Sequence, residues 1–66
     1  MQIIVNGQGR EIAPSTTVAA LLEELQLAGK PVAVEVNRQL VPRHRHTEHR
    51  LSDGDRLEIV TLVGGG

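Results

Sequence analysis

A stripe of four aliphatic residues constrains the fold of this chain more than any other feature of its sequence. The stripe follows the spacing i, i+3, i+4, i+7 of one helix face and consists of Val18, Leu21, Leu22 and Leu25. The hydroxyl-bearing segment 15–17 can cap the first free amides of this helix, and Gly29 and Pro31 stand where it would stop. We therefore predict one amphipathic helix over residues 17–27, which needs a sheet to cover.

A hairpin is predicted before the helix. Residues 3–5 are β-branched, and the Asn6-Gly7 pair behind them is a strong turn signal. Gly9 adds a second flexible point, so residues 10–13 form the predicted returning strand. The glycines do not open a helix, which argues against a phosphate-binding loop.

More strands are predicted after the helix. Residues 32–36 alternate with valines in one phase, which should face the helix, and they lead through a turn at 37–38 into a strand at 39–41. Residues 43–50 contain no apolar side chain and are predicted to be an irregular surface segment, which Leu51 pins to the core. A turn then leads to a final strand over residues 56–63.

These elements give the order ββαβββ, an α+β arrangement in which a mixed sheet packs on one helix. Because a helix crossover links parallel strands, the first and last strands should lie side by side. The order resembles the ubiquitin-like β-grasp fold. We assign residues 1–63 to this domain and residues 64–66 to a flexible C-terminal glycine tail.

Composition excludes several classes of function. The chain has no cysteine and no aromatic residue, so it has no disulfide, no thiol nucleophile and no base-stacking platform. Seven basic and eight acidic residues give a net charge of −1, which argues against a general nucleic-acid binder. With no basic leader and no apolar run near the ~18 residues of a membrane span, we expect a cytoplasmic protein without a membrane partner.

The segment between residues 38 and 50 carries an unusual group of side chains. His44, His46 and His49 have a ligand-like spacing, but the neighbouring arginines would repel a divalent metal, so we predict no metal site. The segment holds four arginines and one glutamate, a charge of +3, against −4 in the rest of the chain. Either it steers an acidic partner or it is an ordinary solvated surface.

The glycines at the C-terminus are difficult to explain by folding, because glycine loses the most conformational freedom when it is ordered. Gly64, Gly65 and Gly66 have no Cβ atoms, so they could thread a narrow channel in a partner protein. A terminal carboxylate has a pKa near 3.3–3.7 and is a poor electrophile at neutral pH. Acylation at this carbon would therefore need ATP. A tail without function is the alternative.

The sequence resembles the ThiS family of thiamine-biosynthesis sulfur carriers over nearly its full length. The resemblance is carried by residues 1–7 (Met-Gln-Ile-Ile-Val-Asn-Gly), 17–22, 32–37, 41–43, 51–55 and 63–66. It implies that a ThiF-like E1 enzyme uses ATP to adenylate Gly66. Sulfur from cysteine, delivered by a desulfurase persulfide, then displaces AMP and leaves a thiocarboxylate, which the thiazole synthase ThiG receives.

The resemblance also implies a carrier that binds no cofactor and catalyses nothing, with Gly66 as the reactive residue and Gly64 and Gly65 as its tail. The histidine and arginine segment is not part of the family pattern, so no role is transferred to it. Three alternatives stay open: a molybdopterin synthase small-subunit type of carrier, a ubiquitin-like protein modifier, and a non-reactive β-grasp binding module.

A docking surface is predicted on the face of the sheet away from the helix. In the last strand, Leu57, Ile59, Thr61 and Val63 share the phase that should face the helix. Val60 and Leu62, together with Ile4, would then leave apolar area exposed on the open face. We expect this patch to bind the activating enzyme and the synthase.

Overall fold

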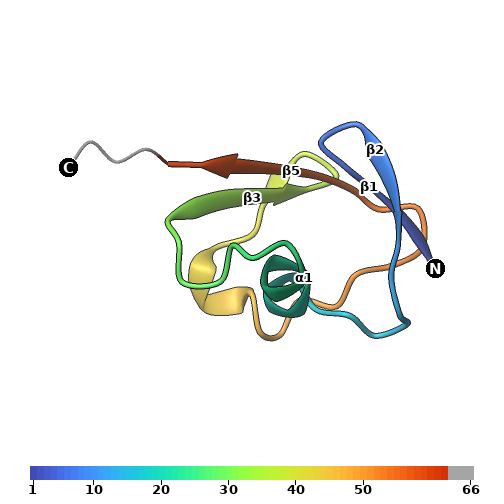
Figure 1. The fold of residues 1–66 in the computed structure, drawn as a ribbon, viewed down its shortest axis with the longest axis horizontal. Coiled ribbons are helices and arrows are strands. Elements are labelled where there is room, and N and C mark those ends of the chain that lie inside the picture. Colours follow the sequence, from blue (N-terminus) through green and yellow to red (C-terminus); the bar gives the residue numbers. More distant parts are fainter. Residues whose placement is uncertain (63–66) are drawn as a thin grey trace.

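A five-stranded mixed sheet covers one α-helix in the computed structural model, which describes residues 1–62. The elements in chain order are β1 (Gln2–Val5), β2 (Gln8–Glu11), α1 (Val18–Glu24), β3 (Val32–Val36), β4 (Gln39–Leu40), the 3₁₀ helix η1 (Arg43–Arg45) and β5 (Arg56–Thr61). The sheet forms one layer, and α1 with η1 forms the second layer below it (Figure 1). The predicted α+β order ββαβββ is confirmed.

β5 occupies the centre of the sheet, whose strand order is β2-β1-β5-β3-β4. It runs parallel to β1, with Ile4 beside Arg56 and Val5 beside Leu57, and antiparallel to β3 over its whole length. The predicted pairing of the first and last strands is therefore confirmed. The last strand of the chain is held by a neighbour on each side.

Both hairpins turn on two residues with positive φ. Asn6 (φ 50°) and Gly7 (φ 84°) form the first turn, as the Asn-Gly pair predicted, and residues 37–38 form the second in the same way. Because a two-residue turn pairs Val5 directly with Gln8, β2 begins at Gln8 and not at residue 10. Gly9 therefore lies inside the strand and is not a second flexible point.

Helix α1 spans Val18–Glu24 and is shorter than the predicted 17–27. Gln26 adopts φ 62°, and the N–H of Leu27 binds the carbonyl of Leu22 at 2.8 Å. A left-handed residue just past the cap, with this backward bond, closes the helix as a Schellman motif. The helix ends there, before the glycine that the sequence suggested as its stop.

The segment 43–50 lies on the surface, as its composition predicts, but it is more ordered than an irregular loop. It contains η1, and His46 is buried (7% exposed), with its Nε2 donating to the carbonyl of Val41 at 3.0 Å. The backbone carbonyls of His46 and His49 accept the amides of the first two residues of α1, at 2.9 Å each. The segment therefore caps the helix from outside, because those first amides have no partner within the helix.

The core lies between α1 and the sheet, as the apolar stripe predicted. Its buried side chains are Ile3, Ile12, Val18, Leu21, Leu22, Val34, Val36, Val41, Leu51, Leu57 and Ile59. Burial of Leu51 confirms that it pins the preceding segment to the core. Val34 and Val36 face the helix as expected, and Val32 is half-buried against the same cluster.

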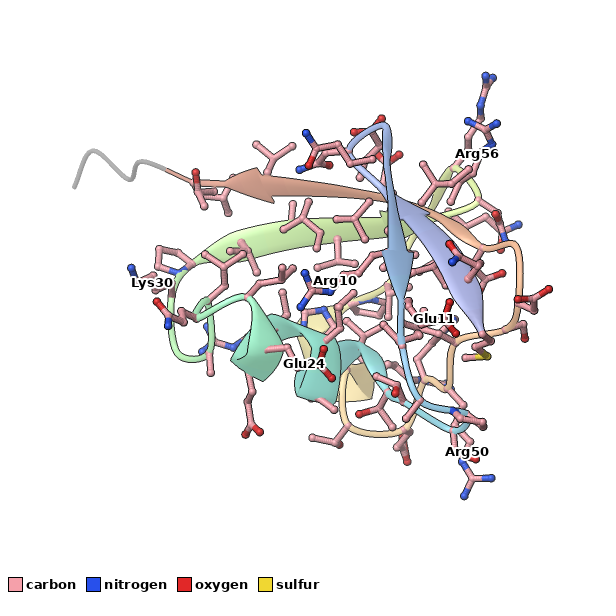
Figure 2. The ribbon with its side chains drawn as sticks, turned by 45° about the vertical axis from the view of Figure 1, so that its right-hand side comes forward. Arg10, Glu11, Glu24, Lys30, Arg50 and Arg56 are labelled. Atoms are coloured by element: carbon pink, nitrogen blue, oxygen red, sulfur yellow. The ribbon has the colours of Figure 1, made fainter. Side chains whose placement is uncertain are left out.

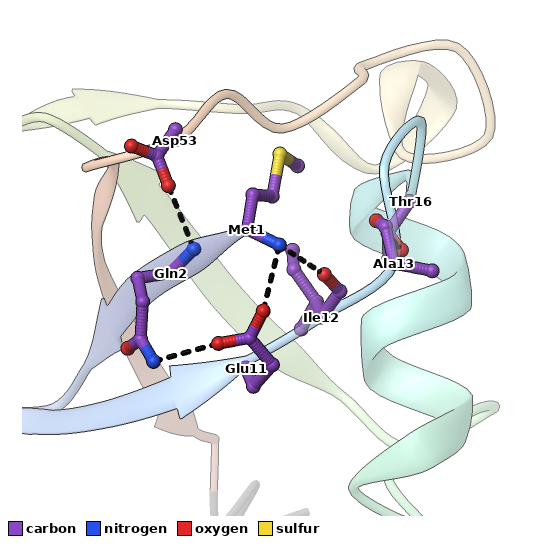
Figure 3. Close-up of polar contacts among 7 residues, drawn as sticks. All are labelled: Met1, Gln2, Glu11, Ile12, Ala13, Thr16 and Asp53. Atoms are coloured by element: carbon purple, nitrogen blue, oxygen red, sulfur yellow. Dashed lines mark hydrogen bonds and ion pairs between the residues drawn. The ribbon is translucent and has the colours of Figure 1, made fainter.

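The start of the chain is tied to the sheet by polar contacts (Figure 3). The Met1 ammonium group lies 2.9 Å from Glu11 Oε2 and donates to the Ile12 carbonyl at 2.7 Å. Gln2 donates from its side chain to Glu11 and from its backbone to Asp53 Oδ1, both at 2.7 Å. These contacts join β1 to β2 and to the turn that leads into β5.

Candidate functional site

The predicted reactive tail continues directly from the central strand. β5 ends at Thr61, two residues before the predicted end at Val63, and the Leu62 N–H still donates to the Pro31 carbonyl at 2.8 Å. Val63 and the predicted tail at Gly64, Gly65 and Gly66 lie outside the described residues, and so does the proposed domain boundary. The structure thus describes the chain as far as Leu62, one residue before the predicted end of the domain.

Asn6 extends the pairing of β5 by one step beyond the backbone ladder. β1 pairs with β5 only at Ile4 and Val5. The Asn6 side chain then accepts the Ile59 N–H at 2.8 Å and donates to the Ile59 carbonyl at 3.1 Å. The side-chain amide of Asn6 thereby pairs with both the N–H and the carbonyl of Ile59, which the backbone of a longer β1 would otherwise have paired. The sequence analysis assigned Asn6 only to the turn and missed this role.

The open face of the sheet carries the exposed apolar residues that the strand alternation predicts. Leu57 and Ile59 are 2% and 8% exposed against the helix, whereas Val60 and Leu62 are 55% and 50% exposed on the other side. Thr61 shares the phase of the buried residues but is itself exposed, at the rim of a hollow between β5 and the end of α1. The exposure of Val60 and Leu62 is confirmed.

Ile4 does not adjoin Val60 on this face. It is half-buried and pairs with Arg56, which lies four residues from Val60 along β5, or roughly 13 Å at ~3.3 Å per residue. Leu40, at 64% exposed, is a further apolar residue on the open face, because it pairs with the outward-facing Glu35. The two-residue turn before β4 fixes this register and could have revealed Leu40.

The histidines do not converge on one point. His46 is bound to the Val41 carbonyl, His44 is exposed and His49 is half-buried. Across residues 1–62, no three His, Cys, Asp or Glu side chains gather closely enough to hold a metal ion. The backbone of the segment 43–50 thus caps the helix, while its arginine side chains remain available for other contacts.

The hydroxyl groups before the helix have structural partners. Thr17 Oγ1 accepts the Ala20 N–H at 3.1 Å as the helix cap, and Thr16 donates to the Ala13 carbonyl at 2.6 Å. Capping is the role predicted for this segment, and the Thr17 cap confirms it. In the described part of the chain, no helix is long and apolar enough to cross a membrane.

A mixed sheet with a central last strand parallel to the first, packed on one helix, defines a ubiquitin-like β-grasp protein. The family model described as ThiS family matches residues 3–66, which is nearly the whole chain. The chain therefore belongs to the ThiS family, as the sequence motifs suggested.

Relatives of known name and structure agree with this assignment. The sulfur carrier protein ThiS of Escherichia coli is 36% identical over 66 residues that cover all of both chains. A thiazole synthase of Paramagnetospirillum magneticum is 44% identical over 66 residues, and the chain spans only 20% of its length. The crystal structure of a thiamine biosynthesis protein (ThiS) from Geobacter metallireducens covers all of both chains with a TM-score of 0.85 and 33% identity.

Proposed function

We propose that this chain carries sulfur for thiazole formation in thiamine biosynthesis, bound to the terminal carbon of Gly66. The observation that carries the proposal is the full-length match to a protein named as a sulfur carrier, in a family model that runs to residue 66. The fold agrees, because the chain leads into the glycine tail from a strand that is held on both sides as far as Ile59.

The chemistry begins with a carboxylate that must be activated. A ThiF-like E1 enzyme joins a carboxylate oxygen of Gly66 to the α-phosphorus of ATP and releases pyrophosphate. The terminal sulfur of a protein persulfide, charged by a cysteine desulfurase, then attacks the acyl carbon and displaces AMP. A thiol reductant cleaves the resulting sulfur–sulfur bond and leaves the thiocarboxylate. ATP is a substrate of the partner, so the carrier needs no cofactor of its own.

The carrier is a cosubstrate and not the catalyst of these steps. It has no cysteine, so no internal thiol competes for the sulfur. The residues after Leu62 number four, which covalent geometry limits to about 14 Å of reach. The active centre that receives Gly66 must therefore lie close to the surface on which the domain docks.

A ThiG-type thiazole synthase is the proposed acceptor of the sulfur. Two relatives named thiazole synthase match this chain over its whole length, and the match covers 20% of each relative. This supports a functional association between carrier and synthase. The exposed Val60 and Leu62, with Leu40 farther along the same face, form the proposed docking face. Ile4, predicted as part of the patch, lies apart from them and contributes at most a separate contact.

The direct test is the intact mass of the chain after incubation with the E1 partner, ATP, a persulfide source and a thiol reductant. We expect the mass shift of one oxygen-for-sulfur exchange, and none in a variant that lacks Gly66. Unfolding curves of the two chains should coincide, which shows that the missing residue affects chemistry alone. Thiazole formation by the shortened variant would overturn the proposal, and conjugates of higher mass would indicate a protein modifier instead.

A further inference from the structure

A hollow beside β4 lies at the opposite end of the sheet from the tail. β4 pairs with residues 35–36 at the end of β3, whereas β5 leaves the sheet beside Val32 at its start. The hollow has a volume of about 560 Å³ and is lined by Val36, Gln39, Leu40, Val41, Pro42, Arg45, Glu48, His49 and Arg50. We call it the β4 groove. Its lining combines apolar residues of β3 and β4 with charged residues of the segment 43–50.

The backbone that presents these charges is held in place. The Arg45 N–H donates to the Pro42 carbonyl at 2.8 Å, and the His49 N–H donates to the Arg45 carbonyl at 2.9 Å. Arg50 forms an isolated β-bridge with Thr17 at the start of the helix. Together with the buried ring of His46, these contacts preorganise the segment, so a ligand would lose little binding energy in ordering it.

The arginines of the β4 groove lack carboxylate partners within residues 1–62. The ion pairs found there join the Met1 ammonium to Glu11 and Arg10 to Glu24. Figure 2 shows Arg10 directed toward Glu24, whereas Arg50 points away from the body of the molecule. Glu48 also lines the groove but lies farther than 4 Å from either arginine, so two guanidinium groups remain available for a planar anion.

We propose that the β4 groove binds a segment of a partner protein in which an apolar side chain is flanked by carboxylates. The apolar side chain would contact Leu40 and Pro42, the exposed apolar residues of the lining. The carboxylates would pair with Arg45 and Arg50. The groove gives the carrier a second contact, which adjoins the docking face at Leu40 and lies apart from the tail. This inference does not depend on chemistry at Gly66.

An acidic protein segment fits the groove better than a nucleic acid does. Nucleic-acid sites combine many cations with aromatic stacking surfaces, and this chain has no aromatic residue and a net charge of −1. The groove has an apolar floor and includes Glu48, which would repel a row of phosphates. Charge complementarity therefore selects carboxylates on a partially apolar peptide.

The test is a titration of the ¹⁵N-labelled full chain, followed by amide chemical shifts, with a capped peptide that has a glutamate-leucine-glutamate core. We expect shifts confined to residues 36–50 and binding that weakens as salt rises. The double variant Arg45→Glu/Arg50→Glu should weaken binding at least about tenfold, because each pair is a charge-assisted hydrogen bond. The double variant Lys30→Glu/Arg56→Glu makes the same change in net charge at two residues outside the groove lining, and it should bind as the parent does.

Four results would overturn the proposal: shifts centred on Val60 and Leu62, equal binding of a lysine-leucine-lysine peptide, equal loss in Lys30→Glu/Arg56→Glu, or tighter binding of a single-stranded oligonucleotide. The last result would assign the groove to nucleic acid. If charge reversal disturbs the fold, the neutral variant Arg50→Gln should still lower the affinity while its amide spectrum stays dispersed. Unchanged affinity in that variant would equally contradict the proposal.

Discussion

Alternate residues of β5 lie in two different environments, the core and the open face of the sheet. The residues in the core stabilise the fold, and those on the open face are available for docking. Leu57 and Ile59 are buried against α1, and their neighbours Val60 and Leu62 remain about half exposed on the open face. The pleat sends successive side chains to opposite faces, so one strand serves both faces without conflict. The apolar side chains that stay exposed to solvent after folding are the ones that a partner protein can bury.

The size of the chain makes this separation necessary. At ~0.05–0.15 kcal/mol per residue, a domain of 66 residues has a free energy of unfolding of roughly 3–10 kcal/mol. The face against α1 can lose little of its packing before the domain unfolds. The open face, by contrast, can change without affecting the fold, and the following substitutions test this difference.

The largest effect is expected at Leu21, which is fully buried in the centre of the helix stripe. Leu21→Ala removes buried methyl groups and leaves a cavity, so the free energy of unfolding should fall by about 2–5 kcal/mol. Urea unfolding followed by circular dichroism measures the loss. The matched control is Leu62→Ala on the open face, which removes the same atoms and should change stability by less than about 0.5 kcal/mol. Equal losses in the two variants would break the comparison.

Asn6 lies where the two regions meet, because its side chain ties the middle of β5 to the first hairpin. Asn6→Ala removes two hydrogen bonds to Ile59 from a residue with positive φ, so stability should fall by about 2 kcal/mol. Exchange of the Ile59 amide with solvent should accelerate more than that of Val34. Asn6→Asp keeps the acceptor and loses only the donor, so it should lie between the parent and Asn6→Ala. A loss in Asn6→Ala without faster exchange at Ile59 would contradict this role.

The docking face is tested by Val60→Asp/Leu62→Asp. Two charges on exposed positions leave the core untouched, so the free energy of unfolding should change by less than about 0.5 kcal/mol. Binding to the E1 partner would place these charges in an apolar interface, so the rate of charging at limiting carrier should fall at least about tenfold. The double variant Ser15→Asp/Ser52→Asp adds the same charge at exposed sites away from this face. Unchanged charging in the first variant would count against the docking face.

The two faces could be predicted from the sequence because both depend on periodicity. The 3.6-residue period placed the helix stripe, and the two-residue period of the last strand placed Val60 and Leu62 on the open face. Turn signals together with periodicity gave the order of elements, and the rule that a helix crossover links parallel strands gave the pair β1 and β5. Leu40 was missed because β4 has only two residues, too few for an alternation to be visible, so only the register set by the turn at 37–38 indicated its face.

Contacts between distant segments could not be predicted, because their signal is not local. His46 stands among arginines and has no apolar neighbour in sequence, yet it is buried, with its ring bonded to the Val41 carbonyl and its own carbonyl to the Ala19 amide. The Asn6-Gly7 pair already predicted a turn, and nothing further in the local sequence indicated that Asn6 contacts Ile59, 53 residues away. The tail was predicted from composition and resemblance alone, and it lies outside residues 1–62, which the structure describes.

The smallest effect is expected at Gln26, within the layer that stabilises the fold. It adopts φ 62° to close the helix, a conformation that is strained by roughly 1–2 kcal/mol for a residue with a Cβ and favourable for glycine. Glycine loses more conformational freedom on folding, which offsets part of that gain, so Gln26→Gly should stabilise the domain by about 0.5 kcal/mol. Urea unfolding under the same conditions measures the shift.

The control for Gln26→Gly is Glu23→Gly, an exposed position inside the helix, where the same residue should destabilise by about 1 kcal/mol. Opposite signs three residues apart would show that the left-handed turn, and not glycine itself, decides the outcome. Charging of Gln26→Gly should match that of the parent, because the substitution lies in the layer beneath the sheet and the docking face lies above it. A stabilised variant with slower charging would mean that the two faces of the sheet are coupled, and the separation seen along β5 would not hold for the domain as a whole.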